Sequence, residues 1–296
     1  MSTRPASDGR GGVLDAAPPV VLEVDLGPGV RAGFTTRTGG VSPEPWDSLN
    51  LGLNVTDDVT RVRSNRARAS AWLGAPVAFS SQVHGTDVVR LGSPPRDGDG
   101  APVDSVGEAD AIVATAPGVG LGVLVADCVP VLLADADAGV VGVAHAGRRG
   151  LAHGVVPAVL EAMLAAGART GNVRAAVGPS ACGRCYEVPA TMRDDVALAR
   201  PATRSTTSWG TPALDLPAGV VADLVAAGVE DVLRVDACTI EDDRFFSHRR
   251  AARGGTTTGR FAGLVALSAA RPPWSRPPGE VEDAGRVVPG SSDALG

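Results

Sequence analysis

Three side chains that could bind a metal or attack a substrate stand where apolar runs of the sequence turn polar. His84 follows the run VAFSSQV, Cys128 comes soon after GLGVLVA, and His145 ends GVVGVAH. Each run is a strand candidate, and strand ends form the mouth of a site because the sheet fixes their position while the loops leave them open. Two imidazoles and a thiolate suit Zn²⁺, and three protein ligands leave a fourth position for water or substrate, which is typical of catalytic zinc.

The same atoms allow other interpretations. Cys128 and His145 could act without a metal, as a nucleophile and its base. A lone cysteine after a core strand is also often just a small buried hydrophobic residue. Asp127, directly before Cys128, could shuttle a proton or could only orient a ligand. The residue types alone leave these choices open.

An anion site is indicated directly after His145. The sequence AGRRG precedes a predicted helix, so free backbone N–H groups and the guanidinium groups of Arg148 and Arg149 should lie together there. Phosphate would suit such a site, with Arg37 and Arg149 as its expected clamps. A solvated helix start is the simpler alternative for the two neighbouring arginines. His248, in FFSHRR, could line the same cleft.

The remaining cysteines include a C-x-x-C pair, Cys182 and Cys185, and a single Cys238. Such a pair can be half of a structural zinc site or a redox motif. No second C-x-x-C exists, so we interpret the stretch as a loop with incidental thiols. One of these three cysteines could otherwise complete a closed, structural zinc site with the His84, Cys128 and His145 trio, which would make the protein non-catalytic.

Composition restricts the class of protein. The chain has 296 residues, 44% of them hydrophobic, and a net charge of −6. The negative charge argues against a nucleic-acid partner, which usually requires a basic surface. Four cysteines in a chain of this length do not form a disulfide framework, so we expect a reducing cytoplasm. The most apolar run, 119–126, is too short to span a bilayer.

The predicted elements alternate between strands and helices, as in a single α/β domain over residues 21–271. Tails of low apolar content, 1–20 and 272–296, should be disordered. Asp57 or Asp58 can cap a helix, and a second helix should run from Leu151 to Gly167. The four strand candidates between 110 and 145 follow one another too closely for helical crossovers, which predicts a meander. A last helix is expected over 259–270.

Several stretches together resemble the YfiH-type family, also called laccase-domain or multicopper polyphenol oxidase proteins. They include FTTRTGGVS, QVHGTDV, ADCVPVLLAD, GVAHAGRRGL and CTIEDDRFFSHRR, and the resemblance spans about residues 30–267. The family's metal-binding catalytic residues are the histidine of QVHG, the cysteine of ADC and the histidine of HAG, which fall on His84, Cys128 and His145. Two positions depart from the family pattern: Arg148 stands in place of a tryptophan, and His248 in place of a tyrosine.

The resemblance implies a layered α-β-β-α domain with mixed, partly antiparallel sheets, and a zinc-dependent purine nucleoside phosphorylase with adenosine deaminase activity. Its substrates would be inorganic phosphate and adenosine, inosine, guanosine or methylthioadenosine, and we expect a monomer without membrane or nucleic-acid partners. Laccase chemistry is excluded, because a type 1 copper and a trinuclear cluster need far more ligands than four histidines. The alternative is a Cys128–His145 hydrolase that cleaves an amide in a peptidoglycan precursor, on a UDP-sugar amino acid.

Overall fold

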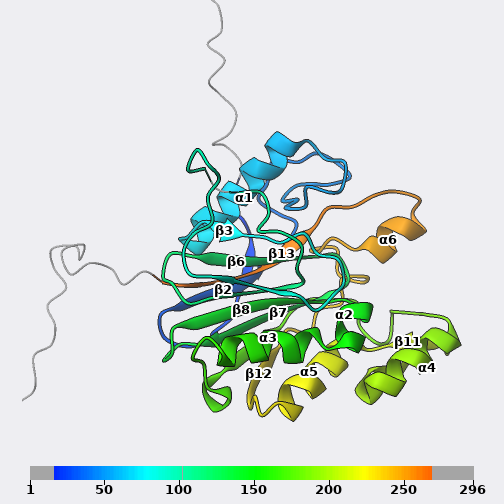
Figure 1. The fold of residues 1–296 in the computed structure, drawn as a ribbon. Coiled ribbons are helices and arrows are strands. Elements are labelled where there is room, and N and C mark those ends of the chain that lie inside the picture. Colours follow the sequence, from blue (N-terminus) through cyan, green and yellow to red (C-terminus); the bar gives the residue numbers. More distant parts are fainter. Residues whose placement is uncertain (1–16, 102, 269–296) are drawn as a thin grey trace, which may run out of the picture.

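The computed structural model describes residues 17–101 and 103–268, in which two β-sheets lie face to face between layers of helices (Figure 1). One sheet has the strand order β1 (Val21–Glu23), β2 (Val30–Thr35), β13 (Phe261–Leu267), β6 (Gly120–Val125) and β3 (Val77–Ala78). The other has the order β12 (Asp231–Arg234), β9 (Arg174–Val177), β7 (Val129–Asp135), β8 (Val140–Ala146), β5 (Ala111–Ala114) and β4 (Val88–Leu91). Both sheets are mixed, which confirms the predicted α/β class and layering.

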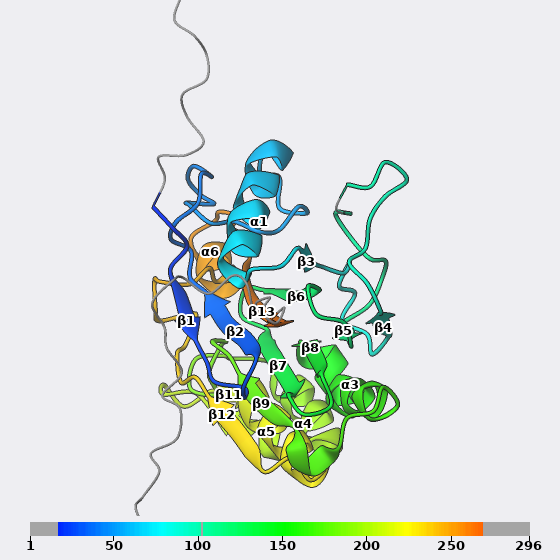
Figure 2. The ribbon, with the colours of Figure 1, turned by 90° about the vertical axis from the view of Figure 1, so that its left-hand side faces the viewer.

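Helices cover the two outer faces, as Figure 2 shows from the side. Helix α1 (Val59–Leu73) packs on the five-stranded sheet, while α3 (Val155–Leu164) and α5 (Leu216–Ala226) pack on the six-stranded sheet. The smaller elements are α2 (Arg148–His153), α4 (Ala190–Ala199), α6 (His248–Arg253), the hairpin β10 (Arg204–Thr206) with β11 (Pro212–Leu214), and two short 3₁₀ helices, Thr170–Asn172 and Pro201–Thr203. No helix in this described part is long and apolar enough to cross a membrane.

The core between the sheets is aliphatic, because aromatic residues are only 3% of the sequence. Strands β7 and β8 are buried at every position, which explains why their sequences are nearly continuous apolar runs. Phe34 is a large exception. Its ring lies so close to Gly178 that a Cβ there would come within 2.3 Å of it, and glycine therefore makes room for the aromatic side chain.

The meander predicted between residues 110 and 145 is wrong. Strand β6 belongs to the five-stranded sheet, where it pairs with β13 and β3, while β5, β7 and β8 belong to the other sheet. The chain therefore crosses from one sheet to the other before β6 and again after it. Short connections exclude helical crossovers, but they do not decide which of two facing sheets takes a buried strand.

Two further expectations need correction. Residues 259–270 were expected to be helical, but FAGLVAL forms the central strand β13, buried at all seven positions; a short run that is apolar throughout has no periodicity to distinguish the two states. The helix predicted from Leu151 to Gly167 is divided into α2 and α3 at Gly154, whose φ is 98°. Asp58 caps α1 as predicted, accepting hydrogen bonds from the N–H groups of Thr60 and Arg61. The predicted disordered tails lie outside the described residues, apart from 17–20.

Candidate functional site

His84, Cys128 and His145 come together where the chain crosses between the two sheets. Cys128 lies in the link from β6 to β7, His145 is the penultimate residue of β8, and His84 lies in a turn well beyond β3, which ends at Ala78. Their ligand atoms all lie within 4.8 Å of one another. The Cys128 Sγ is 3.8 Å from Nε2 of His84, and the two imidazole rings meet edge to face at 4.7 Å. The trio chosen from the sequence is therefore one cluster.

Asp110 organises this cluster, and sequence reasoning missed it. Its buried carboxylate accepts a 2.7 Å hydrogen bond from Nδ1 of His145 and further bonds from the backbone N–H groups of Val83, His84 and Gly85. One side chain thus orients one histidine and holds the turn that carries the other. The signal in the sequence was a carboxylate directly before a fully buried strand, Ala111–Ala114, where an unpaired charge would be costly.

The backbone around the trio adopts unusual conformations. His84 has a φ of 62° and Asp127 a φ of 94°, both in the left-handed region that non-glycine residues rarely occupy. Gly147 leaves room for the trio, because a Cβ at this position would lie 2.5 Å from Cδ2 of His84 and 3.1 Å from Sγ of Cys128. The turn after β8 therefore has to be glycine for the three side chains to meet.

Cys128 and His145 form a charged pair when no metal is bound. Burial opposes ionisation of the Cys128 thiol, but the charge of His145 and hydrogen bonds from His145 and His84 outweigh it and lower its pKa to about 6. Burial likewise opposes protonation of His145, but Cys128 and the hydrogen bond to Asp110 raise its pKa to about 9. The site therefore favours a thiolate, which is the form that binds a metal or attacks a substrate.

The donor set fits a zinc ion. A thiolate and two imidazoles are ligands that zinc prefers, and three of them leave a position open. Asp110 occupies Nδ1 of His145, which leaves the other ring nitrogen for a metal, and a carboxylate behind a ligating histidine is the usual arrangement. Cys182, Cys185 and Cys238 cluster instead with Glu241, so none of them joins the trio as a fourth ligand.

A cavity of about 710 Å³ opens beside the trio and is large enough for a nucleoside. Its walls come from segments far apart in the chain. They include the trio itself and Gln82, Asp104, Asp127, Tyr186 and His248, together with three arginines, Arg66, Arg249 and Arg260.

Comparison with known proteins identifies the family at this point. A model of the family described as multi-copper polyphenol oxidoreductase laccase matches residues 31–268. The chain belongs to this family. A purine nucleoside phosphorylase of Streptomyces griseus is 52% identical over 237 residues, which are 79% of this chain and 93% of the relative. One of Mycobacterium tuberculosis is 46% identical over 239 residues, or 80% of this chain and 91% of the relative.

Solved structures agree with the family and the fold. A protein of Neisseria meningitidis aligns with a TM-score of 0.72 and 33% identity, covering 84% of this chain and 99% of that one. YlmD of Geobacillus stearothermophilus aligns with a TM-score of 0.70 and 35% identity, covering 81% and 93%. The laccase-domain fold is therefore shared over nearly the whole of these relatives.

The arginines expected to bind phosphate in this laccase-domain chain lie away from the cavity lining. Arg37 donates to the backbone oxygen and the carboxylate of Asp47, both at 2.6 Å, and its guanidinium lies over Phe246. Arg149 is exposed on the first turn of α2. Arg148, the departure from the family pattern, hydrogen-bonds Tyr186 in the cavity wall. Sequence proximity to His145 indicated Arg149, but the helix directs that position to solvent.

The arginines that do line the cavity have no carboxylate ion pair among the described residues. Arg66 donates to the backbone oxygens of Leu51 and Asp104, and Arg260 to those of Thr258 and Gly259. Burial lowers the pKa of Arg66 to about 10 and also lowers the pKa of Arg260. Half-buried cations whose hydrogen bonds go to carbonyl groups form a site that an anion would stabilise.

Asp127 has its two carboxylate oxygens engaged. Oδ1 accepts a 2.7 Å hydrogen bond from the Thr239 hydroxyl, and Oδ2 accepts a 2.6 Å bond from the backbone N–H of Arg249. Of the two roles predicted for it, this geometry favours the positioning of Cys128 over proton transfer. His248 lines the cavity as expected, at the start of α6.

Proposed function

We propose that this protein is a zinc-dependent purine nucleoside phosphorylase. The observation that carries the proposal is the open set of three metal ligands, His84, Cys128 and His145, in the wall of a nucleoside-sized cavity that also contains arginines. The names of relatives that align over most of this chain support the same activity.

Zinc is the metal that we propose, because the donor set is mixed nitrogen and sulfur and the chain has too few histidines for a multicopper centre. When bound, zinc would supply a Lewis acid that stabilises negative charge developing on a reacting group. The chain's own part is to hold the ligands: Asp110 fixes the ring of His145, and Asp127 fixes the link that carries Cys128.

Phosphate would bind at the arginines of the cavity, with Arg260 the principal candidate. A phosphate oxygen attacks the anomeric carbon of the ribose, the bond from that carbon to the purine nitrogen breaks, and the purine leaves with the electron pair and takes up a proton. The products are ribose 1-phosphate and the free base. Burial lowers the pKa of Arg260 and the charges of Cys128 and Asp127 oppose this shift, so the guanidinium lies near the trio, which supports an anion site there.

The purine would lie against Tyr186 and His248, which both line the cavity. Adenosine, inosine, guanosine and methylthioadenosine are the proposed substrates. In the adenosine deaminase reaction, which we propose as a second activity of the same cavity, water replaces the amino group at C6 of the base and gives inosine and ammonia. That reaction needs no phosphate.

Assays of these nucleosides with and without phosphate test the proposal. Formation of ribose 1-phosphate and free base that depends on phosphate, and that a His145→Ala variant loses, would support phosphorolysis. Adenosine is set aside here, because its deamination needs no phosphate. Release of the base from the other nucleosides at the same rate without phosphate would contradict the proposal.

The second candidate function is a metal-free Cys128 hydrolase, which the low pKa of its thiol favours. An amide of a UDP-sugar amino acid would be its substrate. Metal content separates the two: a protein purified without metal whose amidase activity is lost on alkylation of Cys128 would be the hydrolase. If His84→Ala loses both the bound zinc and the activity on nucleosides, the protein is the phosphorylase.

A further inference from the structure

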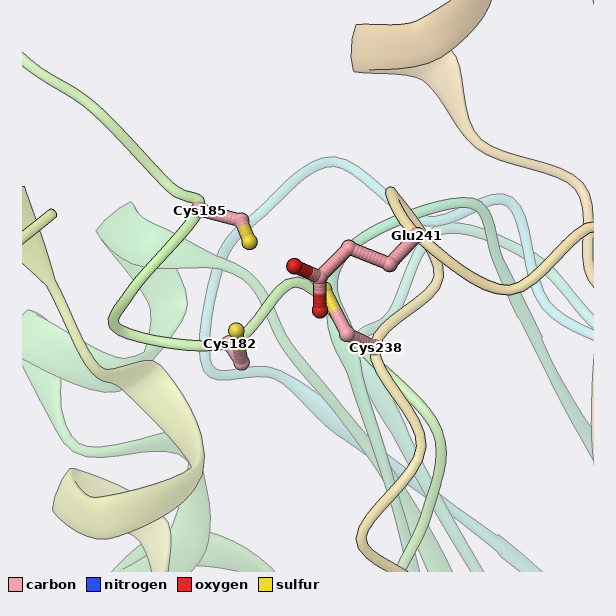
Figure 3. A group of neighbouring side chains, drawn as sticks. All are labelled: Cys182, Cys185, Cys238 and Glu241. Carbon is pink, nitrogen blue, oxygen red and sulfur yellow. The ribbon is translucent and has the colours of Figure 1, made fainter. Parts of the chain in front are cut away.

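A second group of metal-binding side chains lies apart from the trio, in two loops that follow neighbouring strands. Cys182 and Cys185 come after β9, and Cys238 and Glu241 come after β12 (Figure 3). Strands β9 and β12 are parallel and in register, with Val177 opposite Arg234, so both loops leave the same edge of the sheet. The ligand atoms of the four residues all lie within 4.8 Å of one another.

The two loops have the same local geometry. The N–H of Cys185 donates to the oxygen of Cys182 at 3.0 Å, and the N–H of Glu241 donates to the oxygen of Cys238 at 3.1 Å. Each turn thus presents a pair of ligands three residues apart, as C-x-x-C and C-x-x-E. A short bridge joins the turns, because Ser180 exchanges backbone hydrogen bonds with Ala237 and Thr239.

We propose that Cys182, Cys185, Cys238 and Glu241 bind a structural Zn²⁺ ion. Two pairs of ligands with short spacing are typical of structural zinc, and four protein ligands close the tetrahedral site, unlike the three of the trio. A donor set dominated by sulfur selects zinc over magnesium or calcium. On binding, the zinc ion replaces the thiol protons, which pass to solvent.

The backbone supports the sulfur of Cys238 as a ligand. The N–H groups of Cys182, Ile240 and Glu241 donate hydrogen bonds to it, while burial outweighs them and raises the pKa of the thiol. No salt bridge of Glu241 occurs within the described ranges, and Arg250, which reaches this loop, donates to its backbone oxygens at Thr239, Ile240 and Asp242. Glu241 hydrogen-bonds the Cys185 thiol, and a bound cation would replace this contact.

A disulfide between two of the cysteines explains the cluster less well. It would leave the third thiol and Glu241 without a role, although both point into the same space (Figure 3). The described cysteines are all free thiols. The sequence interpretation of C-x-x-C did not take account of Cys238, which is more than fifty residues away and is brought close only by the parallel pairing of β9 with β12.

This ion would stabilise the wall of the catalytic cavity. Ala181, next to Cys182, donates its N–H to the backbone oxygen of Asp127, and Thr239, next to Cys238, donates its hydroxyl to the Asp127 carboxylate. Tyr186, which lines the cavity, follows Cys185 directly. The two loops joined by the proposed ion are therefore the loops that hold Asp127 beside Cys128.

Counting metal ions in the purified full chain under reducing conditions tests the proposal without any assay of activity. Wild type should hold about two zinc ions per chain, and the double variant Cys182→Ser, Cys185→Ser about one. His84→Ala should also hold about one, and the combination of all three changes should hold none. Replacement of zinc by Co²⁺ in His84→Ala should give the strong visible absorption of a tetrahedral thiolate site, which the combined variant should lack.

Glu241→Gln provides a test that does not endanger folding, because the residue is exposed. We expect it to lose this zinc to a chelator roughly 10-fold faster than wild type. Asp243→Asn, a neighbouring exposed carboxylate outside the cluster, is the matched control and should behave as wild type. One zinc in wild type and the same one zinc in the cysteine double variant would overturn the proposal.

Discussion

Asp110 decides the geometry of the metal ligands at the scale of single residues, although it is not a ligand itself. It accepts four hydrogen bonds, one from His145 and three from the turn that carries His84. A carboxylate directly before a buried strand indicates a paired charge, but it does not indicate that the partner is a candidate metal ligand. The trio could be predicted from the sequence because its members are chemically rare in this chain, whereas Asp110 is one of 33 acidic residues.

Asp110→Asn should weaken zinc binding by roughly 10–100-fold, because an amide cannot accept all of these hydrogen bonds or stabilise the charge on His145. Competition with a chelator measures the change. Asp135→Asn is the matched control: Asp135 is also a buried carboxylate that accepts backbone hydrogen bonds, from Ala138 and Arg169, and it sits at the far end of β7. Equal losses of zinc affinity in both variants would contradict the role assigned to Asp110.

Cys128 should be the most reactive cysteine of the metal-free protein. Its pKa is lowered to about 6, so the reactive thiolate is populated above that pH and lost as the pH falls through it. Burial raises the pKa of Cys185, which should react only in much more alkaline solution. Alkylation by iodoacetamide, located by peptide mass, should have a midpoint near pH 6 for Cys128. His145→Gln should move that midpoint upward, and an unchanged midpoint would exclude the charged pair.

At the scale of elements, the sites depend on junctions between strands and loops rather than on the strands themselves. Capping of α1 by Asp58 and the strands β7 and β8 could be predicted because their signals are local. The assignment of β6 to the opposite sheet, the strand at 261–267 and the meeting of Cys238 with Cys182 could not, because each depends on pairing between distant segments. Both groups of candidate metal ligands, the trio and the cluster of Cys182, Cys185, Cys238 and Glu241, lie where segments distant in the sequence come into contact.

Gly147→Ala tests the junction between β8 and α2. Gly147 has φ −75° and ψ 168°, which alanine adopts without strain, so the effect of the added methyl group should come only from its contact with His84 and Cys128. We expect loss of zinc and of activity with the fold retained, as measured by metal content and circular dichroism. Gly171→Ala, where a Cβ meets open space, should keep both. Full zinc content in Gly147→Ala would show that the trio has more room than the structure indicates.

At the scale of the whole molecule, an acidic protein assembles a cavity that contains three arginines. The net charge is −6, yet Arg66 on α1, Arg249 on α6 and Arg260 before β13 meet at the wall that holds the trio. Their positions in the sequence lie up to almost two hundred residues apart, so no local pattern indicated that these three arginines share one cavity wall. The layered fold brings them together by placing β13 between β2 and β6.

Arg260→Gln separates phosphorolysis from deamination. Phosphate takes part only in the first reaction, so loss of a charge-assisted contact worth about 1.5–3 kcal/mol should raise the KM for phosphate by roughly 10-fold or more. Adenosine deamination by the same preparation should fall much less. Arg149→Ala, which removes an exposed guanidinium outside the cavity lining, is the control and should change neither reaction by more than about 2-fold. A rise in the KM for phosphate in Arg149→Ala, with none in Arg260→Gln, would assign the phosphate site to the start of α2. Parallel losses of both activities in Arg260→Gln would show that this arginine stabilises the cavity and does not bind the anion.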